Sequence, residues 1–170
     1  IPNLMFWGSS GTGKGTITKI ICSNLDCEYM RINGSDENGV DMVRDKIGTF
    51  VSSVSFKKFR IVVIDEFDYF TPNAQAVLRN MIESSYKNAR FIVTLNYPNR
   101  IIEPLHSRFQ EWEVKPIDTS LIEKRMFGIL KKEEIKFEDD DVVEIVKSCY
   151  PDVRKTIQTI QQYSIDGELK

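Results

Sequence analysis

A glycine-rich run near the start of the chain has the residue types and spacing of a phosphate-binding loop. It follows an apolar stretch, precedes a helical pattern and reads Gly8-Ser9-Ser10-Gly11-Thr12-Gly13-Lys14. Glycines let backbone N–H groups turn toward a phosphate, and the start of a helix adds a partial positive charge. The lysine is placed to reach the β- and γ-phosphates as a mobile point charge. The sequence therefore predicts that residues Gly8–Thr16 bind a nucleotide.

The residue after this lysine departs from the usual pattern. Phosphate loops normally carry Ser or Thr there, and the hydroxyl binds Mg²⁺. This chain has Gly15 followed by Thr16. Three alternatives follow: Thr16 supplies the hydroxyl, a water fills the gap, or metal binding is weakened. The string Gly-Lys-Gly-Thr also resembles the loop of adenylate kinases, so the loop alone leaves two enzyme classes open.

A second group of reactive side chains follows the apolar run Ile61–Ile64. Asp65 and Glu66 come directly after it. At the carboxyl end of a central parallel strand, these carboxylates are expected to emerge beside the phosphate loop. Asp65 suits Mg²⁺, directly or through water, and Glu66 suits polarisation of a water that attacks a nucleotide.

The elements that must position these residues alternate between strand and helix patterns. Apolar runs that favour strands are Leu4–Trp7, Tyr29–Ile32, Ile61–Ile64 and Phe91–Leu95, with a fifth candidate at Trp112–Val114. Helical patterns between them are Lys14–Leu25, Gly39–Val54 and Pro72–Tyr86. Strands separated by helix-length segments indicate βαβ units, hence an α/β fold with a parallel sheet covered on both faces.

The pattern changes near residue 117. Three helical stretches follow and no convincing strand: Thr119–Lys132, Asp139–Ser148 and Asp152–Tyr163. Asp118, Asp139 and Asp152 stand where N-caps or first-turn acids belong. We therefore expect a nucleotide-binding domain over residues 1–117 and a small helical domain over residues 118–170.

Composition narrows the class of protein. The 170 residues are 41% hydrophobic and 28% charged, and 25 acidic against 23 basic side chains give a net charge of −2. This is a globular composition that disfavours a wholesale basic nucleic-acid binder. No run is long enough to cross a bilayer and no secretion signal is evident. The three cysteines indicate reduced thiols, so we expect a cytoplasmic protein.

Further motifs in the same order along the chain resemble AAA+ ATPases, and more closely the clamp-loader subunits of replication factor C and of tailed phages. The resemblance rests on Asn33-Gly34-Ser35-Asp36, Asp65-Glu66-Phe67-Asp68, Thr94-Leu95-Asn96-Tyr97, the stretch that ends in Ser107-Arg108, and Pro151-Asp152-Val153-Arg154. It implies a RecA-like P-loop NTPase domain (Walker A loop, Walker B acids) followed by a helical lid. It also implies that an N-terminal segment and a C-terminal collar of the family are missing from this chain.

The resemblance implies a role for each matching residue. Asn96 is expected to contact the γ-phosphate or the attacking water beside the catalytic Glu66. Arg108 would be an arginine finger that reaches the ATP of a neighbouring subunit, and Arg154 would contact the γ-phosphate in cis. Asn33 stands where the family holds the catalytic glutamate away until DNA arrives.

The resemblance also implies DNA contact and partners. Backbone N–H groups of Asn38, Gly39 and Val40, at the start of a helix, would bind the phosphates of DNA. The partners would be further subunits in a ring or spiral, a sliding clamp and primer–template DNA, with no membrane. If the chain is phage-encoded, as the resemblance to tailed-phage subunits allows, its cytoplasm is that of the host. The chain is thus expected to bind and hydrolyse ATP with Mg²⁺ in order to load a clamp. The alternatives are a nucleotide kinase, or a clamp-loader subunit that binds nucleotide without hydrolysing it.

Overall fold

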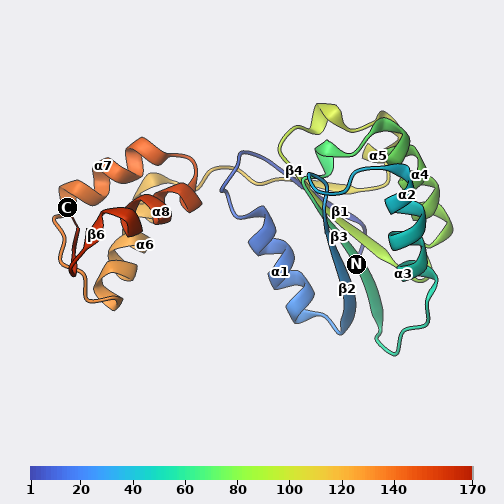
Figure 1. Cartoon of the computed structure of the whole chain (residues 1–170), viewed down its shortest axis with the longest axis horizontal. Helices are drawn as coiled ribbons and strands as arrows, with labels where there is room; N and C mark the ends of the chain where they lie inside the picture. Colours follow the sequence, from blue (N-terminus) through green and yellow to red (C-terminus); the bar gives the residue numbers. More distant parts are fainter. Residues whose placement is uncertain (170) are drawn as a thin grey trace. The chain divides into compact units, whose positions relative to one another are not determined.

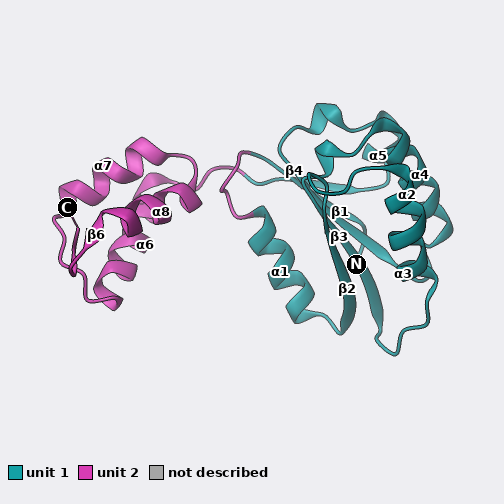
Figure 2. Ribbon diagram, viewed as in Figure 1, with its two compact units in different colours: residues 1–8, 14–114 teal, residues 9–13, 115–170 magenta. Residues whose placement is uncertain are grey.

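The structure is a computed structural model that describes residues 1–169. The chain forms two compact units (Figure 2). The first contains residues 1–8 and 14–114, and the second contains residues 9–13 and the residues from Lys115 onward. The change between them falls at Val114 and Lys115, close to the predicted boundary at residue 117. Residues 9–13 of the glycine-rich loop, which we placed in the first domain, belong by their contacts to the second unit.

The first unit is built on a five-stranded sheet in the order β2-β3-β4-β1-β5. All neighbouring strands pair in parallel, which confirms the predicted α/β sheet. The strands are β1 (Leu4–Trp7), β2 (Cys27–Asn33), β3 (Phe59–Asp65), β4 (Arg90–Leu95) and β5 (Gln110–Glu113). β2 therefore lies at one edge of the sheet, next to the strand that carries Asp65.

Helices cover both faces of this sheet (Figure 1). Helix α1 lies on one face, and α2, α3 and α4 lie on the other. Their bounds are α1 (Lys14–Asn24), α2 (Val40–Met42), a π-helix (Val43–Ile47), α3 (Gly48–Ser52), α4 (Pro72–Ser84) and α5 (Glu103–His106), with short 3₁₀ turns at Phe67–Tyr69 and Pro98–Arg100. The predicted helix Gly39–Val54 is thus helical but changes to π geometry in its middle.

The run Ile61-Val62-Val63-Ile64 shows why the sheet needs cover on both faces. Ile61 and Val63 pack in one hydrophobic cluster with Cys22 of α1. Val62 and Ile64 point the other way, into a larger cluster that contains α4 residues. Successive side chains of a strand alternate between faces, so an uninterrupted apolar run buries both. These four residues are at most 1% exposed.

The strand register brings the reactive residues to one edge. Asn33 pairs with Asp65 at the ends of β2 and β3, and Trp7 pairs with Leu95 at the ends of β1 and β4. Because the strands are parallel, the loops that leave them all emerge at the carboxyl edge of the sheet. Lys14, the two acids after β3 and Asn96 therefore lie at the same edge of the sheet.

The second unit is a small helical bundle. It contains α6 (Thr119–Lys132), α7 (Asp139–Cys149) and α8 (Val153–Tyr163), as predicted. Asp118 caps α6 by accepting from the Ser120 N–H at 2.9 Å, and Asp152 caps α8 by accepting from the Lys155 N–H at 2.9 Å. Both bonds satisfy amide groups that a helix start leaves without partners. The side chains that form its core are Ile122, Met126, Leu130, Val142, Val146, Ile160 and Leu169.

The expectation of no strand after residue 118 was wrong in one place. Two-residue strands β6 (Ser164–Ile165) and β7 (Glu168–Leu169) form an antiparallel hairpin. Strands this short carry no periodic signal in a sequence. Leu169 anchors the hairpin because its side chain is buried in the bundle core. Among the helices of residues 1–169, none has the length and apolar character needed to traverse a bilayer.

Candidate functional site

The loop between β1 and α1 has the backbone of a phosphate cradle. Gly11 and Gly13 have φ angles of 71° and 97°, in the left-handed region that favours glycine. The Thr12 hydroxyl donates to the Ser9 carbonyl oxygen at 2.9 Å and so closes the loop on itself. A loop of this shape directs N–H groups toward a bound anion.

Lys14 and Asn96 meet at this edge of the sheet. The Lys14 ammonium donates to the Gly8 carbonyl oxygen at 2.9 Å and to Asn96 Oδ1 at 2.9 Å. Lys14 is the first residue of α1 and is buried, and Asn96 directly follows β4. Lys14 is thus held beside the expected position of the phosphates, and the amide oxygen of Asn96 accepts a hydrogen bond from its ammonium group. A phosphate oxygen can exchange for either partner because all are hydrogen-bond acceptors.

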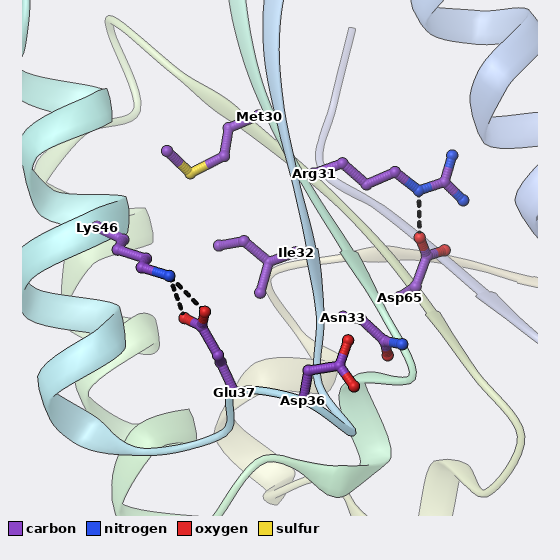
Figure 3. Close-up of a pocket in the computed structure, with 8 residues that line it drawn as sticks. All are labelled: Met30, Arg31, Ile32, Asn33, Asp36, Glu37, Lys46 and Asp65. Carbon is purple, nitrogen blue, oxygen red and sulfur yellow. Dashed lines mark hydrogen bonds and ion pairs between the residues drawn. The ribbon is translucent and has the colours of Figure 1, made fainter.

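Asp65 is held from two sides. Thr94 Oγ1 of β4 donates to Asp65 Oδ1 at 2.9 Å, and Arg31 Nε of β2 donates to Asp65 Oδ2 at 2.5 Å. In Figure 3, Arg31 and Asp65 lie together on one side of β2, and Met30 and Lys46 lie on the other. The Asp65 side chain is 19% exposed and that of Arg31 is 35% exposed.

A pocket of about 580 Å³ lies at the edge strand β2, and Figure 3 shows its lining side chains on both sides of the strand. On its far side Lys46 forms an ion pair with Glu37. The lining side chains are Met30, Arg31, Ile32, Asn33, Asp36, Glu37, Lys46 and Asp65. The pocket is thus charged on both sides of the strand.

The Arg31 side chain occupies the space next to Gly15. A Cβ atom built on Gly15 lies 3.2 Å from Arg31 Nη2 and 4.0 Å from Asp65 Oδ1. A contact of 3.2 Å is tighter than ordinary van der Waals contact. The Arg31 guanidinium therefore lies in the space that a side chain at residue 15 would need.

The predicted Mg²⁺ site at Asp65 and Thr16 does not fit this arrangement. Gly15 has no side-chain oxygen, and both oxygens of Asp65 already accept hydrogen bonds. Thr16 is exposed. Within residues 1–169, no group of three or more His, Cys, Asp or Glu side chains is placed to hold a metal ion. A divalent cation beside Asp65 would also face the positive charge of Arg31.

Glu66 follows Asp65 with an unusual backbone. Its φ of 53° and ψ of 44° are left-handed, a conformation that non-glycine residues adopt rarely. Within residues 1–169 its carboxylate has no hydrogen-bond partner. Within the described residues no hydrogen bond joins it to Asn33, whose amide oxygen accepts from the Ser35 N–H at 3.2 Å. The side chain of Glu66 is therefore available to a ligand or a water.

The other predicted residues lie farther along the chain. Arg108 follows α5, donates from Nε to Glu83 Oε1 at 2.8 Å, and also donates to the Pro104 carbonyl. Arg154 is exposed, one residue after the start of α8 in the second unit. Gly39 precedes α2 with an extended backbone and no side-chain cap, so the first N–H groups of this helix are open to an anion.

Two family profiles match consecutive parts of the chain. Residues 4–116 match the family described as "ATPase family associated with various cellular activities (AAA)". Residues 119–170 match "Sliding-clamp-loader large subunit, AAA+ ATPase lid domain". The chain belongs to the AAA ATPase family. Nucleotide binding is therefore a property of this domain, and the AAA ATPase fold that the motifs predicted is confirmed.

Curated relatives agree with both matches. The replication factor C small subunit of Archaeoglobus fulgidus is 36% identical over 99% of this chain and 55% of its own length. Replication factor C subunit 4 of Homo sapiens is 36% identical over 95% of this chain and 48% of its own length. The chain thus spans about half the length of the curated relatives it matches.

Solved structures show the same fold at low identity. The Thermotoga maritima protein titled "RuvB Holliday junction branch migration motor" has a TM-score of 0.77 and 18% identity. The match covers 96% of this AAA chain and 55% of that one.

Sequence reasoning missed Arg31 as a site residue and did not assign Thr94 a contact. Both lie on strands that flank β3, two and one residues before those strands end. The available signal was Arg31 on the same strand face as Asn33, next to the strand that ends in Asp65. Combined with Gly15 after the loop lysine, that placement indicates a guanidinium beside the Walker B acid.

Proposed function

We propose that this chain is the ATP-binding and ATP-hydrolysing part of a clamp-loader subunit, which uses ATP to place a sliding clamp on primer–template DNA. One observation carries the proposal: an AAA ATPase domain is followed directly by a lid that matches clamp-loader lids. Two relatives named as replication factor C subunits are each 36% identical to this chain over nearly its whole length.

The side chains at the carboxyl edge support nucleotide chemistry. The loop N–H groups and Lys14 bind the β- and γ-phosphates. Glu66 orients a water and accepts its proton as the water oxygen attacks the γ-phosphorus, and the bond to the β–γ bridging oxygen breaks to give ADP and phosphate. Asn96, already hydrogen-bonded to Lys14, positions the γ-phosphate or the water.

Two arginines complete the proposed reaction from outside this edge. Arg108 acts on the ATP of a neighbouring subunit in a ring or spiral, where its guanidinium stabilises the transferred phosphoryl group. Arg154 of the lid contacts the γ-phosphate of its own chain. Asn33 is proposed to engage Glu66 when DNA is absent. That engagement would use the N–H donors of the Asn33 amide, since its oxygen accepts from the Ser35 N–H.

DNA contact is proposed at the helical segment that begins with α2. Asn38, Gly39 and Val40 present backbone N–H groups to DNA phosphates, and the lack of a side-chain cap at Gly39 supports this. Binding of this kind is weak per subunit and strongly salt-dependent. It suits a chain whose net charge is only −2.

The proposal takes ATP as the nucleotide and assigns no residue to Mg²⁺, since the arrangement at Gly15 and Asp65 does not fit the ion. The same observation favours the second candidate, a clamp-loader subunit that binds nucleotide without hydrolysing it. A nucleotide kinase is disfavoured because the lid resembles clamp-loader lids.

The test measures phosphate and ADP release from ATP by the chain together with its partner subunits, clamp and primer–template DNA. DNA-stimulated phosphate release that Glu66→Gln abolishes supports the proposal. Glu144→Gln, which changes the same group at an exposed position on α7, is the matched control. ADP formed from added AMP without free phosphate would instead identify a kinase. ATP binding without phosphate release would identify the non-hydrolysing subunit.

A further inference from the structure

Arg31 lies where a phosphate loop normally directs its metal ion. In phosphate-loop enzymes the Ser or Thr after the lysine holds Mg²⁺, and the acid after the β3-type strand lies on the ion's other side. Here the first of these residues is Gly15. The gap that its missing side chain leaves is taken by Arg31 Nη2, 3.2 Å from the position of a Cβ.

The acid on the other side is already neutralised. Arg31 Nε donates to Asp65 Oδ2 at 2.5 Å, and Thr94 holds the second oxygen at 2.9 Å. The Asp65 carboxylate is therefore already paired with a cation, the Arg31 guanidinium. Side chains from the neighbouring strands β2 and β4 fix the orientation of the carboxylate. A guanidinium supplies a permanent positive charge because it does not deprotonate in proteins.

The guanidinium also keeps free hydrogen-bond donors. Only Nε is used in the pair with Asp65, and within residues 1–169 Nη1 and Nη2 of Arg31 have no hydrogen-bond acceptor. Planar arginine forks bind phosphate oxygens by charge-assisted hydrogen bonds. These donors lie beside Gly15, the residue that follows the phosphate-binding Lys14.

We propose that Arg31 binds the β- and γ-phosphate oxygens of the nucleotide in place of Mg²⁺, so that this chain binds ATP without a divalent cation. The proposal rests on the proposed ATP binding and deepens it. The chain has thus exchanged a metal-binding hydroxyl at residue 15 for a guanidinium from Arg31 of β2. A side chain at position 15 and the guanidinium at position 31 compete for the same space.

The experiment titrates the chain with ATP by calorimetry, once with magnesium chloride and once with excess EDTA. The unaltered chain is expected to bind ATP with affinities that differ less than about threefold between the two buffers. Arg31→Gln is expected to weaken binding in EDTA by about ten- to a hundredfold, the range for one lost charge-assisted contact. Arg44→Gln, the same change at an exposed arginine of the same unit, is expected to leave binding within about twofold.

A double variant tests the exchange itself. Gly15→Thr with Arg31→Gln restores the hydroxyl, clears its space and releases Asp65. We expect this double variant to bind ATP in magnesium and to lose about tenfold or more of its affinity in EDTA. Tryptophan fluorescence of each variant checks its fold, since Trp7 and Trp112 both lie in strands of the first unit.

Two results would overturn the inference while leaving ATP binding intact. One is loss of ATP binding by the unaltered chain in EDTA, and the other is Arg31→Gln binding as tightly as the unaltered chain in EDTA. Failure of the proposed function looks different: no binding in either buffer, with Lys14→Ala indistinguishable from the unaltered chain. A double variant indifferent to magnesium also counts against the exchange.

Discussion

Replacing Gly34 with alanine tests the close approach that sets the end of β2 against the two acids. A Cβ on Gly34 falls 2.4 Å from the Glu66 carbonyl oxygen and 3.1 Å from Phe70 Cδ1. Ordinary contacts begin at 3.4 Å, so the backbone must separate by about 1 Å. Moving Glu66 away costs free energy, because the contacting atom belongs to the backbone and Glu66 already has a left-handed conformation.

The expected loss can be worked from this geometry. The same gap is crossed by the hydrogen bond from the Gly34 N–H to the Asp65 carbonyl oxygen at 2.7 Å. Overpacking a tight site costs about 1–3 kcal/mol, and stretching this bond forfeits part of ~0.5–1.5 kcal/mol. The reduced entropy of the unfolded chain returns ~0.4–1 kcal/mol. We expect Gly34→Ala to lower the free energy of unfolding by about 1–3 kcal/mol.

The assay is urea unfolding followed by tryptophan fluorescence. The two tryptophans of the chain are Trp7 and Trp112, so the signal reports on the first unit. Gly39→Ala is the matched control, since a Cβ there meets nothing within 4 Å. It is expected to change the free energy of unfolding by less than about 0.5 kcal/mol. Equal midpoints for the two variants would refute the close approach at Gly34.

Three further predictions follow from other parts of the chain. Gly128 lies inside α6, and a Cβ built on it meets nothing within 4 Å. Gly128→Ala is therefore expected to stabilise the second unit by about 0.5–1 kcal/mol, measured by circular dichroism of the helices on heating. An unchanged stability would contradict a formed helix at this point. Arg108→Ala is expected to lower DNA-stimulated phosphate release by the assembled subunits by ~10³ while ATP affinity stays within about twofold, and an affinity loss instead would argue against a role in trans. Burial raises the pKa of the Cys22 thiol to about 11 from its ordinary 9.0, so the folded state keeps a proton that the unfolded state releases. That stability is complete below pH 9 and is lost as pH rises toward 11; unfolding curves across this window should show the loss in the unaltered chain, and a Cys22→Ala variant with the same slope would disprove it.

The fold could be predicted from the sequence because its signals are local. The apolar run Ile61–Ile64 has no polar alternation, which indicates a strand buried on both faces, and the glycine-rich loop stands between a strand and a helix. Asp118 and Asp152 predicted helix starts because a capping carboxylate acts within three residues of its own position. The hairpin of β6 and β7 could not be predicted, since two-residue strands depend on the neighbours that pair with them.

The candidate site was predicted in part for the same reason. Strand ends place Lys14, Asp65, Glu66 and Asn96 at one edge of any parallel sheet, and the sequence alone determines that much. The roles of these residues, and of Arg108, Arg154, Asn33 and the helix start at residues 38–40, remain predictions. The proposed assays address those of Lys14, Glu66 and Arg108.

The hydrogen-bond partners of Asp65 depend on how the strands pair. The sequence left three alternatives open after Gly15: Thr16 as the metal ligand, a water in its place, or weakened metal binding. All three were judged from residues near the loop. The side chain that matters is Arg31, sixteen positions farther along, and it reaches Asp65 because β2 and β3 are hydrogen-bonded neighbours in register. Pairing between strands is set by the sheet as a whole. A local sequence pattern therefore does not predict that Arg31 of β2 forms an ion pair with Asp65 of β3. The type of every residue at the site is written in the sequence, and the ion pair that occupies the place of the metal exists only once the sheet has formed.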